Sequence, residues 1–494
     1  MFSNLSRTLL PATLLLACLG FIQCGSAEKD RMPITTSSDE ARTEFVAGRA
    51  LVDNARYHDA LRHFQKAVRI DSGFALAYLF QAYSNPSAKG FFDNLKLAEA
   101  HADKVSEGEQ LLIASALAGA NGDLTRQREM LGKLTKMYPR DEGVLFFFAN
   151  AYFGQQMYDS AAVLCEQTVQ LAPSYAAPYN IMGYAYRALG KPEDAARAFQ
   201  EYIRLIPHDP NPYDSYAELL THMGRFEEAI QQYSLALKQD PSFGASHVGI
   251  AANLVFLGRY DDARSELVRL LDSSDNRGHR RGALVGIVVS YVDEGNFSEA
   301  VAQLQRLYEF DASLPDPTSM SNVLRSEAYL LARLGRFEES ENLLNQAVEV
   351  VVNSDVFPRV KSDVRADHAM WLASLRIEEG RLDEAQTLAD QYLEHVKSSA
   401  NPIRLGYAHL VRGRVAVAKG DFTQGVAELE LTNLQNAWPL YHLAMAYEGL
   451  GDLSRAAELY DQAAKTYELN SLLYALIRKH AAGKALELKQ KLIP

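Results

Sequence analysis

The chain has 494 residues, of which 48% are hydrophobic, and this length exceeds what one compact core usually organises. Acidic residues number 62 and basic residues 50, giving a formal net charge of −12. That balance excludes the basic surface expected of a nucleic-acid-binding protein, so we expect no nucleic-acid partner. A chain of this size that buries its hydrophobic residues is expected either to split into domains or to form a repeat array.

Residues 1–27 have the pattern of an export signal. Arg7 is followed by an apolar run over residues 9–22, which is shorter than the ~20 residues that a transmembrane helix needs. A basic start, a short apolar centre and small residues behind it are typical of bacterial export signals. We therefore expect an exported protein, either periplasmic or associated with the outer membrane. Residues 28–40 are expected to be a polar linker.

Two cysteines lie in this signal, and each is a candidate for lipid attachment. Leu-Leu-Ala-Cys at residues 15–18 resembles a lipobox, in which a small residue precedes the acylated cysteine, and this favours Cys18. Cys24 is the alternative, because polar residues follow it, although Gln23 is not small. Cleavage without lipidation, giving a soluble exported protein, and an uncleaved anchor are the other possibilities. We expect membrane contact only through an N-terminal lipid anchor.

A short sequence motif recurs along almost the whole remaining chain. Its clearest copies, at 190–195, 224–229 and 258–263, join a turn glycine to a pair of acidic residues and an alanine, and they are 34 residues apart. Repeats of this length are typical of helical solenoids. Aligned two residues after the glycine, twelve units are found at Tyr57, Phe91, Leu124, Tyr158, Pro192, Phe226, Tyr260, Phe297, Phe337, Leu382, Phe422 and Leu453.

The spacing divides the array into a regular and a longer part. Units are 33–34 residues apart up to Tyr260 and then lengthen, to 45 residues at most. We therefore expect a regular array over 41–275 and longer units over 276–470. Residues 471–494 are expected to form a basic helix that caps the array, since an open solenoid end needs a polar cover; a docking role for its basic face is the alternative.

In spacing, small residues and terminal prolines, the chain resembles tetratricopeptide-repeat proteins, and as a whole it is similar to exported bacterial members of unestablished role. The resemblance implies an all-α, right-handed α-solenoid of about twelve helix pairs plus a C-terminal capping helix. It also implies a protein or peptide partner, bound along the concave groove that the first helix of each pair lines.

The sequence contains no catalytic motif and no metal-ligand spacing, so we expect no catalytic residues, no metal site and no cofactor. Paired acids such as Glu227 and Glu228 fall at the start of second helices, where negative charge offsets the helix dipole. We interpret them as structural.

Helical spacing separates a groove face from the core face of each first helix. The predicted groove residues are Phe146, Asn150, Phe153, Asn180, Tyr184, Arg187, Asn211, Asp214, Glu218 and His222. Aromatic and amide groups of this kind suit an extended peptide, although a solvated surface without a ligand is the alternative.

Three arginines stand where the strict period first fails. Arg277, Arg280 and Arg281 are either a solvated loop balanced by Asp272 and Asp275 or a contact site for a carboxylate or phosphate.

The function expected from these patterns is a non-catalytic binding scaffold of the cell envelope. An accessory subunit of an envelope assembly or polysaccharide-export machine is the alternative, and an enzyme with a pocket in the longer units is a more remote one.

Overall fold

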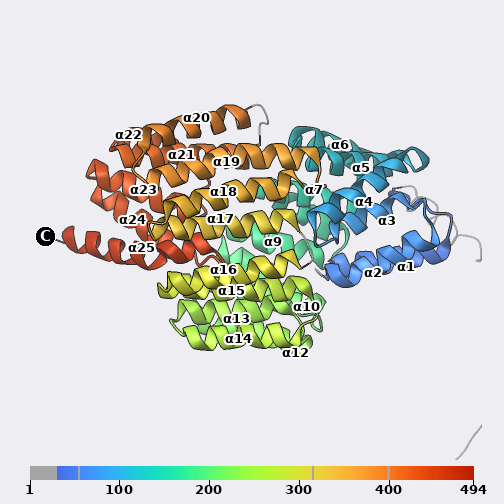
Figure 1. The fold of residues 1–494 in the computed structure, drawn as a ribbon. Coiled ribbons are helices and arrows are strands. Elements are labelled where there is room, and N and C mark those ends of the chain that lie inside the picture. Colours follow the sequence, from blue (N-terminus) through green and yellow to red (C-terminus); the bar gives the residue numbers. More distant parts are fainter. Residues whose placement is uncertain (1–29, 54–55, 314–315, 398–400, 494) are drawn as a thin grey trace, which may run out of the picture.

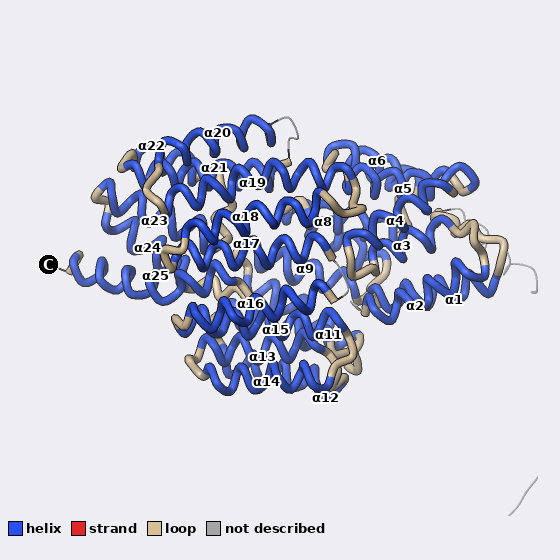
Figure 2. Tube along the Cα trace, in the orientation of Figure 1, coloured by secondary structure: helices blue, strands red, loops and turns tan. Residues whose placement is uncertain are grey.

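The computed structural model describes residues 30–53, 56–313, 316–397 and 401–493. The expected signal (1–27), with Cys18 and Cys24, lies outside these residues. Within them the chain forms twenty-five α-helices and one short 3-10 helix (Ala102–Lys104), without a strand (Figure 2). The expected all-α solenoid class is confirmed.

Consecutive helices pack as twelve pairs, and neighbouring pairs stack side by side (Figure 1). The pairs are α1 (Asp39–Asp53) with α2 (Tyr57–Ile70), α3 (Ala75–Tyr83) with α4 (Ala88–Ala100), α5 (Glu107–Ala120) with α6 (Leu124–Met137), α7 (Glu142–Gly154) with α8 (Tyr158–Leu171), α9 (Ala177–Ala188) with α10 (Pro192–Leu205), α11 (Asn211–His222) with α12 (Phe226–Gln239), α13 (Gly244–Phe256) with α14 (Tyr260–Ser273), α15 (Arg277–Glu294) with α16 (Phe297–Ala312), α17 (Pro317–Arg333) with α18 (Phe337–Val352), α19 (Pro358–Glu378) with α20 (Leu382–Lys397), α21 (Pro402–Lys419) with α22 (Phe422–Leu429) and α23 (Ala437–Leu450) with α24 (Leu453–Ala464). A last helix, α25 (Leu472–Lys491), follows them.

The second helix of a pair begins at the aligned residue in every unit except the second. There α4 starts at Ala88, three residues before Phe91, because Ser87 caps it by accepting a hydrogen bond from the Gly90 N–H. The longer units of the second half are built from longer helices: α15, α19 and α21 have 18, 21 and 18 residues, whereas α9 and α11 have 12.

The turn between paired helices requires a left-handed residue. Nine turn glycines have φ between +69° and +97°. The fourth unit has Gln156 at this place instead, with φ of +61°. A side chain makes this conformation unfavourable by about 1–2 kcal/mol, which explains why glycine is the recurrent residue.

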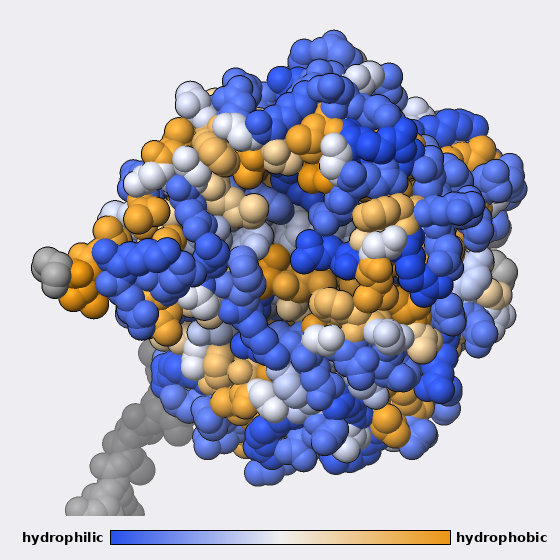
Figure 3. Space-filling model, turned by 60° about the vertical axis from the view of Figure 1, so that its left-hand side comes forward, coloured by the Kyte–Doolittle hydropathy of each residue, from blue (hydrophilic) through white to orange (hydrophobic). Residues whose placement is uncertain are grey.

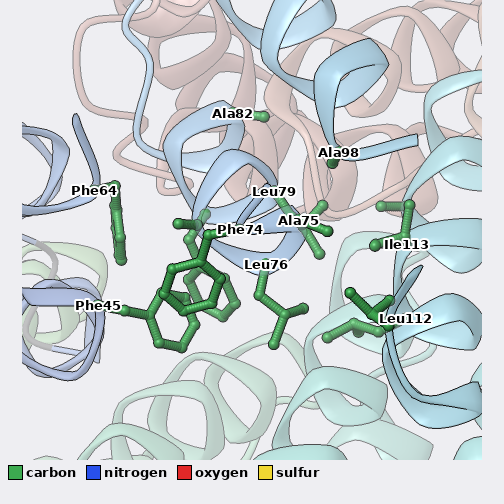
Figure 4. Close-up of a cluster of buried hydrophobic side chains, with 14 of the residues drawn as sticks. Phe45, Phe64, Phe74, Ala75, Leu76, Leu79, Ala82, Ala98, Leu112 and Ile113 are labelled. Atoms are coloured by element: carbon green, nitrogen blue, oxygen red, sulfur yellow. The ribbon is translucent and has the colours of Figure 1, made fainter. Parts of the chain in front are cut away.

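Close approach of the two helices explains the small residue in each first helix. A Cβ atom added at Gly183 would lie 2.5 Å from the Phe199 ring, and one at Gly48 would lie 2.6 Å from Phe64. Ring and glycine are sixteen residues apart in both units. In the N-terminal core, the Phe45 ring packs against the rings of Phe64 and Phe74, and all three side chains are fully buried (Figure 4).

The array coils far enough to bring distant units into contact (Figure 1). Phe92 of α4 stacks on Phe357, just before α19, with ring centres 4.9 Å apart. At the other end of the chain α25 packs on α15 as well as on α23 and α24. There Arg478 makes two hydrogen bonds to Asp293, whose side chain is 1% exposed, at 2.6 and 2.8 Å.

We expect Gln156→Gly to stabilise the protein by about 1 kcal/mol, because glycine adopts the left-handed turn without steric cost. The reciprocal change Gly190→Gln, at the equivalent turn of the next unit, should destabilise it by a similar amount. Chemical denaturation followed by circular dichroism measures both. A loss of stability in Gln156→Gly would contradict this account.

Candidate functional site

The concave face of the first five units encloses two adjoining cavities of about 430 and 410 Å³. Five residues line both: Arg49, Asp53, Phe80, Phe147 and Tyr175. They come from α1, α3, α7 and the start of the α9 unit. We call the two cavities together the N-terminal hollow. Figure 3, which brings forward the side of the molecule that carries the C-terminal helices, shows a hollowed surface there, with hydrophobic and hydrophilic residues mixed around the opening.

Aromatic rings form much of the wall of the N-terminal hollow. The Arg49 guanidinium lies 5.5 Å from the Phe80 ring centre and 5.7 Å from that of Phe147, within cation–π range. The Tyr175 hydroxyl donates a hydrogen bond of 3.1 Å to Asp53. Burial raises the pKa of the Asp53 carboxyl, although the Arg49 charge opposes the shift.

Three of the predicted groove residues line this hollow: Phe146, Asn150 and Asn180. Phe146 packs edge-on against Tyr175, with ring centres 5.4 Å apart. Asn150 is exposed and donates a hydrogen bond to the Phe146 carbonyl. The Asn180 Oδ1 atom is buried and accepts no hydrogen bond from any described residue, so it is an acceptor available to a ligand.

Phe153 lies farther along α7, beyond that wall. Its ring packs edge-on against Tyr158 at the start of α8, with ring centres 5.4 Å apart. It does not line either cavity.

The next predicted residues form a hydrogen-bonded group among themselves. Glu218 accepts hydrogen bonds from the Tyr184 hydroxyl at 2.8 Å and from Arg187 at 2.7 Å. Burial alone would raise the pKa of Glu218, but the neighbouring His222, 3.8 Å away, and the Arg187 charge lower it to about 2. Asp214 accepts a hydrogen bond from the Ser246 hydroxyl, and burial raises its pKa to about 7.

The C-terminal segment lies across the groove at this point. The carbonyl of Thr466 is 2.7 Å from His222 Nδ1, and the Tyr467 ring packs edge-on against Phe226 at 4.9 Å. Asn211 is buried and donates to the Tyr202 hydroxyl. At α11 and α12 the groove is therefore covered by the molecule's own residues, Thr466 and Tyr467.

The arginine cluster is helical instead of forming a loop. Arg277 begins α15 and donates to the carbonyls of Phe310 and Asp311, while Arg281 donates to the Asp311 carboxylate. Asp311 supplies a carboxylate contact to both of these arginines. Arg280 is exposed.

The expected linker is held in place over its described part. Its backbone N–H groups donate to three carboxylates: Met32 to Asp141 at the start of α7, Thr35 to Glu109 in the first turn of α5, and Ser37 to Asp71 at the end of α2, at 2.7–2.8 Å. Together with Ile34, Met32 forms part of the wall of the N-terminal hollow. This segment, Arg31–Ser37, is thus an extended peptide bound along three units.

The tetratricopeptide-repeat family model matches residues 182–242, 249–315 and 325–402, and a second model of the same family matches residues 440–468. The chain contains tetratricopeptide repeats. Proteins with these repeats bind protein partners, and their fold is that of an interaction scaffold.

Solved tetratricopeptide structures are similar to this chain at low identity. Yeast Tom70 is 14% identical over 91% of this chain and 96% of its own, at a TM-score of 0.41. The protein TTC0263 of Thermus thermophilus is 22% identical over 44% of this chain and 99% of its own, at a TM-score of 0.30. MamA is 20% identical over 33% of this chain and 90% of its own, at a TM-score of 0.29. No curated protein matches the sequence.

A second pocket of the tetratricopeptide array was missed by sequence reasoning. It has a volume of about 400 Å³ and is lined mainly by α17, α19 and α21, with residues of α20, α23 and α25. We call it the C-terminal pocket. The register that predicts groove residues in the first half of the chain would have found this pocket. Counting twelve and eight residues back from the starts of α18, α20 and α22 gives six residues, and all six line the pocket. They are Arg325 and Tyr329, Met370 and Ser374, and Leu410 and Arg414.

Among the described residues, no helix is both long and apolar enough to span a membrane. The same part of the chain has no group of three or more side chains arranged to bind a metal ion.

The raised pKa of Asp214 predicts a pH-dependent stability. A carboxyl that titrates near 7 when folded and near 3.8 when unfolded binds more protons in the folded state between these values, so stability falls as pH rises through that window. We expect the melting temperature of Asp214→Asn to fall less between pH 5 and pH 8 than that of the unaltered protein, by roughly a few degrees.

Thermal denaturation at several pH values measures this difference. Asp272→Asn, on α14, is the matched control and should follow the unaltered protein, because that carboxyl lies outside the hydrogen-bonded group around Glu218. Parallel curves for Asp214→Asn and the unaltered protein would contradict the assignment.

Proposed function

We propose that this tetratricopeptide protein is an exported, non-catalytic scaffold that binds an extended segment of a partner protein in the N-terminal hollow. The hollow combines aromatic walls with a few polar groups, which is the composition of peptide-binding grooves. Its volume and its position over five units suit a segment of several residues. The middle of the concave face, by contrast, is occupied by Thr466 and Tyr467.

The observation that carries the proposal is the bound segment Arg31–Ser37. It forms one wall of the hollow, and three of its backbone N–H groups donate to carboxylates, of which Asp141 also lines the hollow. The units that form the hollow therefore already hold an extended backbone by its amide groups. The buried Asn180 Oδ1, which has no donor among the described residues, offers a similar acceptor inside the hollow.

Aromatic burial would supply most of the affinity in this arrangement, because each ring buries a large apolar area on contact with a partner. The amide of Asn180 would fix the register of the bound backbone. Arg49, held between two rings, would favour an acidic side chain on the partner.

The envelope location rests on residues 1–27, whose pattern is that of an export signal, with Cys18 as the preferred lipidation residue and Cys24 as the alternative. A lipid there would hold the scaffold at a membrane surface and leave the repeats in solution.

Photo-crosslinking tests the proposed surface. A benzoylphenylalanine placed at Phe146 should capture a partner in cells that produce the protein, whereas the same group at Val163, half exposed on α8 outside the hollow, should not. Capture should be reduced by about tenfold or more in Asn180→Ala, which removes the unsatisfied acceptor. Equal capture from both positions would remove the hollow from the proposal.

Metabolic labelling with a fatty-acid analogue tests the anchor. We expect incorporation into the unaltered protein and its loss in Cys18→Ala, with Cys24→Ala unchanged, because the residue before the cleavage site must be small. Loss only in Cys24→Ala would reassign the anchor. No incorporation in the unaltered protein would leave soluble export as the remaining form of the proposal.

A further inference from the structure

The C-terminal pocket has an aromatic wall that concentrates a rare residue. Trp371 and Trp438 are the chain's two tryptophans, and both line it. Tyr329 packs edge-on against Trp438, with ring centres 5.9 Å apart, and Tyr392 and the half-exposed Tyr407 complete the wall. Such a cavity accepts the flat or apolar body of a small molecule.

Several buried N–H donors at this wall have no acceptor. Nε1 of Trp371, Nε of Arg404 and Nε of Arg414 are buried and make no hydrogen bond to any described residue. Arg414 is only 7% exposed, and its guanidinium lies 5.5 Å from the Trp438 ring centre. Because a buried donor without an acceptor is unfavourable, three of them around one cavity indicate that a ligand supplies the acceptors.

The acidic side chains of the pocket are already used. Arg404 binds both Asp363 and Asp367. The pocket is lined by three arginines against these two aspartates, which leaves one positive charge in excess. A cationic ligand would find its counter-charges taken.

Because Arg414 lies 3.7 Å from Glu378 beside the pocket, the excess charge falls on Arg325. Its guanidinium donates a hydrogen bond of 2.7 Å to the Ser321 hydroxyl, and it forms no ion pair with a carboxylate of the described residues. It lies 5.9 Å from the Trp371 ring centre. Burial lowers the pKa of the Arg325 guanidinium. The charge of Asp367 opposes this shift, but Arg404 already binds that carboxylate, so an entering anion would stabilise the Arg325 guanidinium further.

We propose that the C-terminal pocket binds a small organic anion. Its apolar or aromatic body lies between Trp371 and Trp438, and its carboxylate or phosphate pairs with Arg325 and accepts the free N–H groups. This site is separate from the N-terminal hollow, and its test is independent of the partner proposed there.

Tryptophan fluorescence gives a direct test, because both tryptophans line this one pocket. The full protein is titrated with 4-phenylbutyrate and with its uncharged amide, 4-phenylbutyramide, and calorimetry checks the affinities. We expect the acid to change the fluorescence below about 1 mM and to bind at least about tenfold more tightly than the amide. Phenyl phosphate should bind like the acid.

Substitutions at Arg325 assign the anion contact. Arg325→Met should abolish the preference for the acid, and Arg325→Lys should keep part of it, because the charge remains without the planar fork. Arg126→Met, at an exposed arginine of α6, is the matched control and should bind like the unaltered protein. Circular dichroism melting establishes that each variant is folded, and Arg325→Lys keeps the test decisive should the methionine variant unfold.

Three results would overturn the proposal: no binding of the acid up to about 10 mM, equal binding of acid and amide, or an unchanged preference in Arg325→Met. A pentapeptide ending in phenylalanine is titrated as well, to distinguish binding of a small free acid from binding of the C-terminal carboxylate of a polypeptide. Binding of the peptide without binding of the small acid would also overturn it, since the pocket would then recognise a polypeptide.

Discussion

The buried ion pair between Arg478 and Asp293 fixes the end of the chain to its middle, and the shape of the concave face depends on it. With both partners out of water, their two hydrogen bonds must offset a large desolvation cost, which favours one precise docking of α25 on α15. That docking places Thr466 and Tyr467 across α11 and α12. The N-terminal hollow and the C-terminal pocket are thereby separate instead of forming one long groove.

The N-terminal hollow and the C-terminal pocket differ in chemistry, although both are lined from the same positions of the first helices. The N-terminal hollow is bounded by an extended segment and exposes amides, which suits a polypeptide backbone. The C-terminal pocket is more aromatic and has excess positive charge around Arg325. The same helical positions thus carry different side chains in the two halves, as expected when a repeat fold is fixed by its core positions and leaves its concave positions free to diverge.

Sequence reasoning predicted the helix pairs closely, because turn glycines and small packing residues are local requirements. Gly183 must be small because Phe199 lies against it, and both belong to one unit. Phe146 and Asn180, which sequence reasoning assigned to the groove face, line the N-terminal hollow. Sequence reasoning could not predict that His222 would meet Thr466, 244 residues away, because that contact depends on how much each unit rotates against the next. For the same reason, the sequence alone did not predict that Arg277 lies against Asp311 of α16.

The order of contacts along Arg31–Ser37 has a mechanical consequence. Met32 is held by Asp141 in the fourth unit, Thr35 by Glu109 in the third and Ser37 by Asp71 beside the second. A pull on the chain N-terminal to Arg31 therefore loads the contact with the fourth unit first and reaches α1 last. The array would yield to a pull by releasing one bond at a time, so its first repeat is shielded from force by the segment that precedes it.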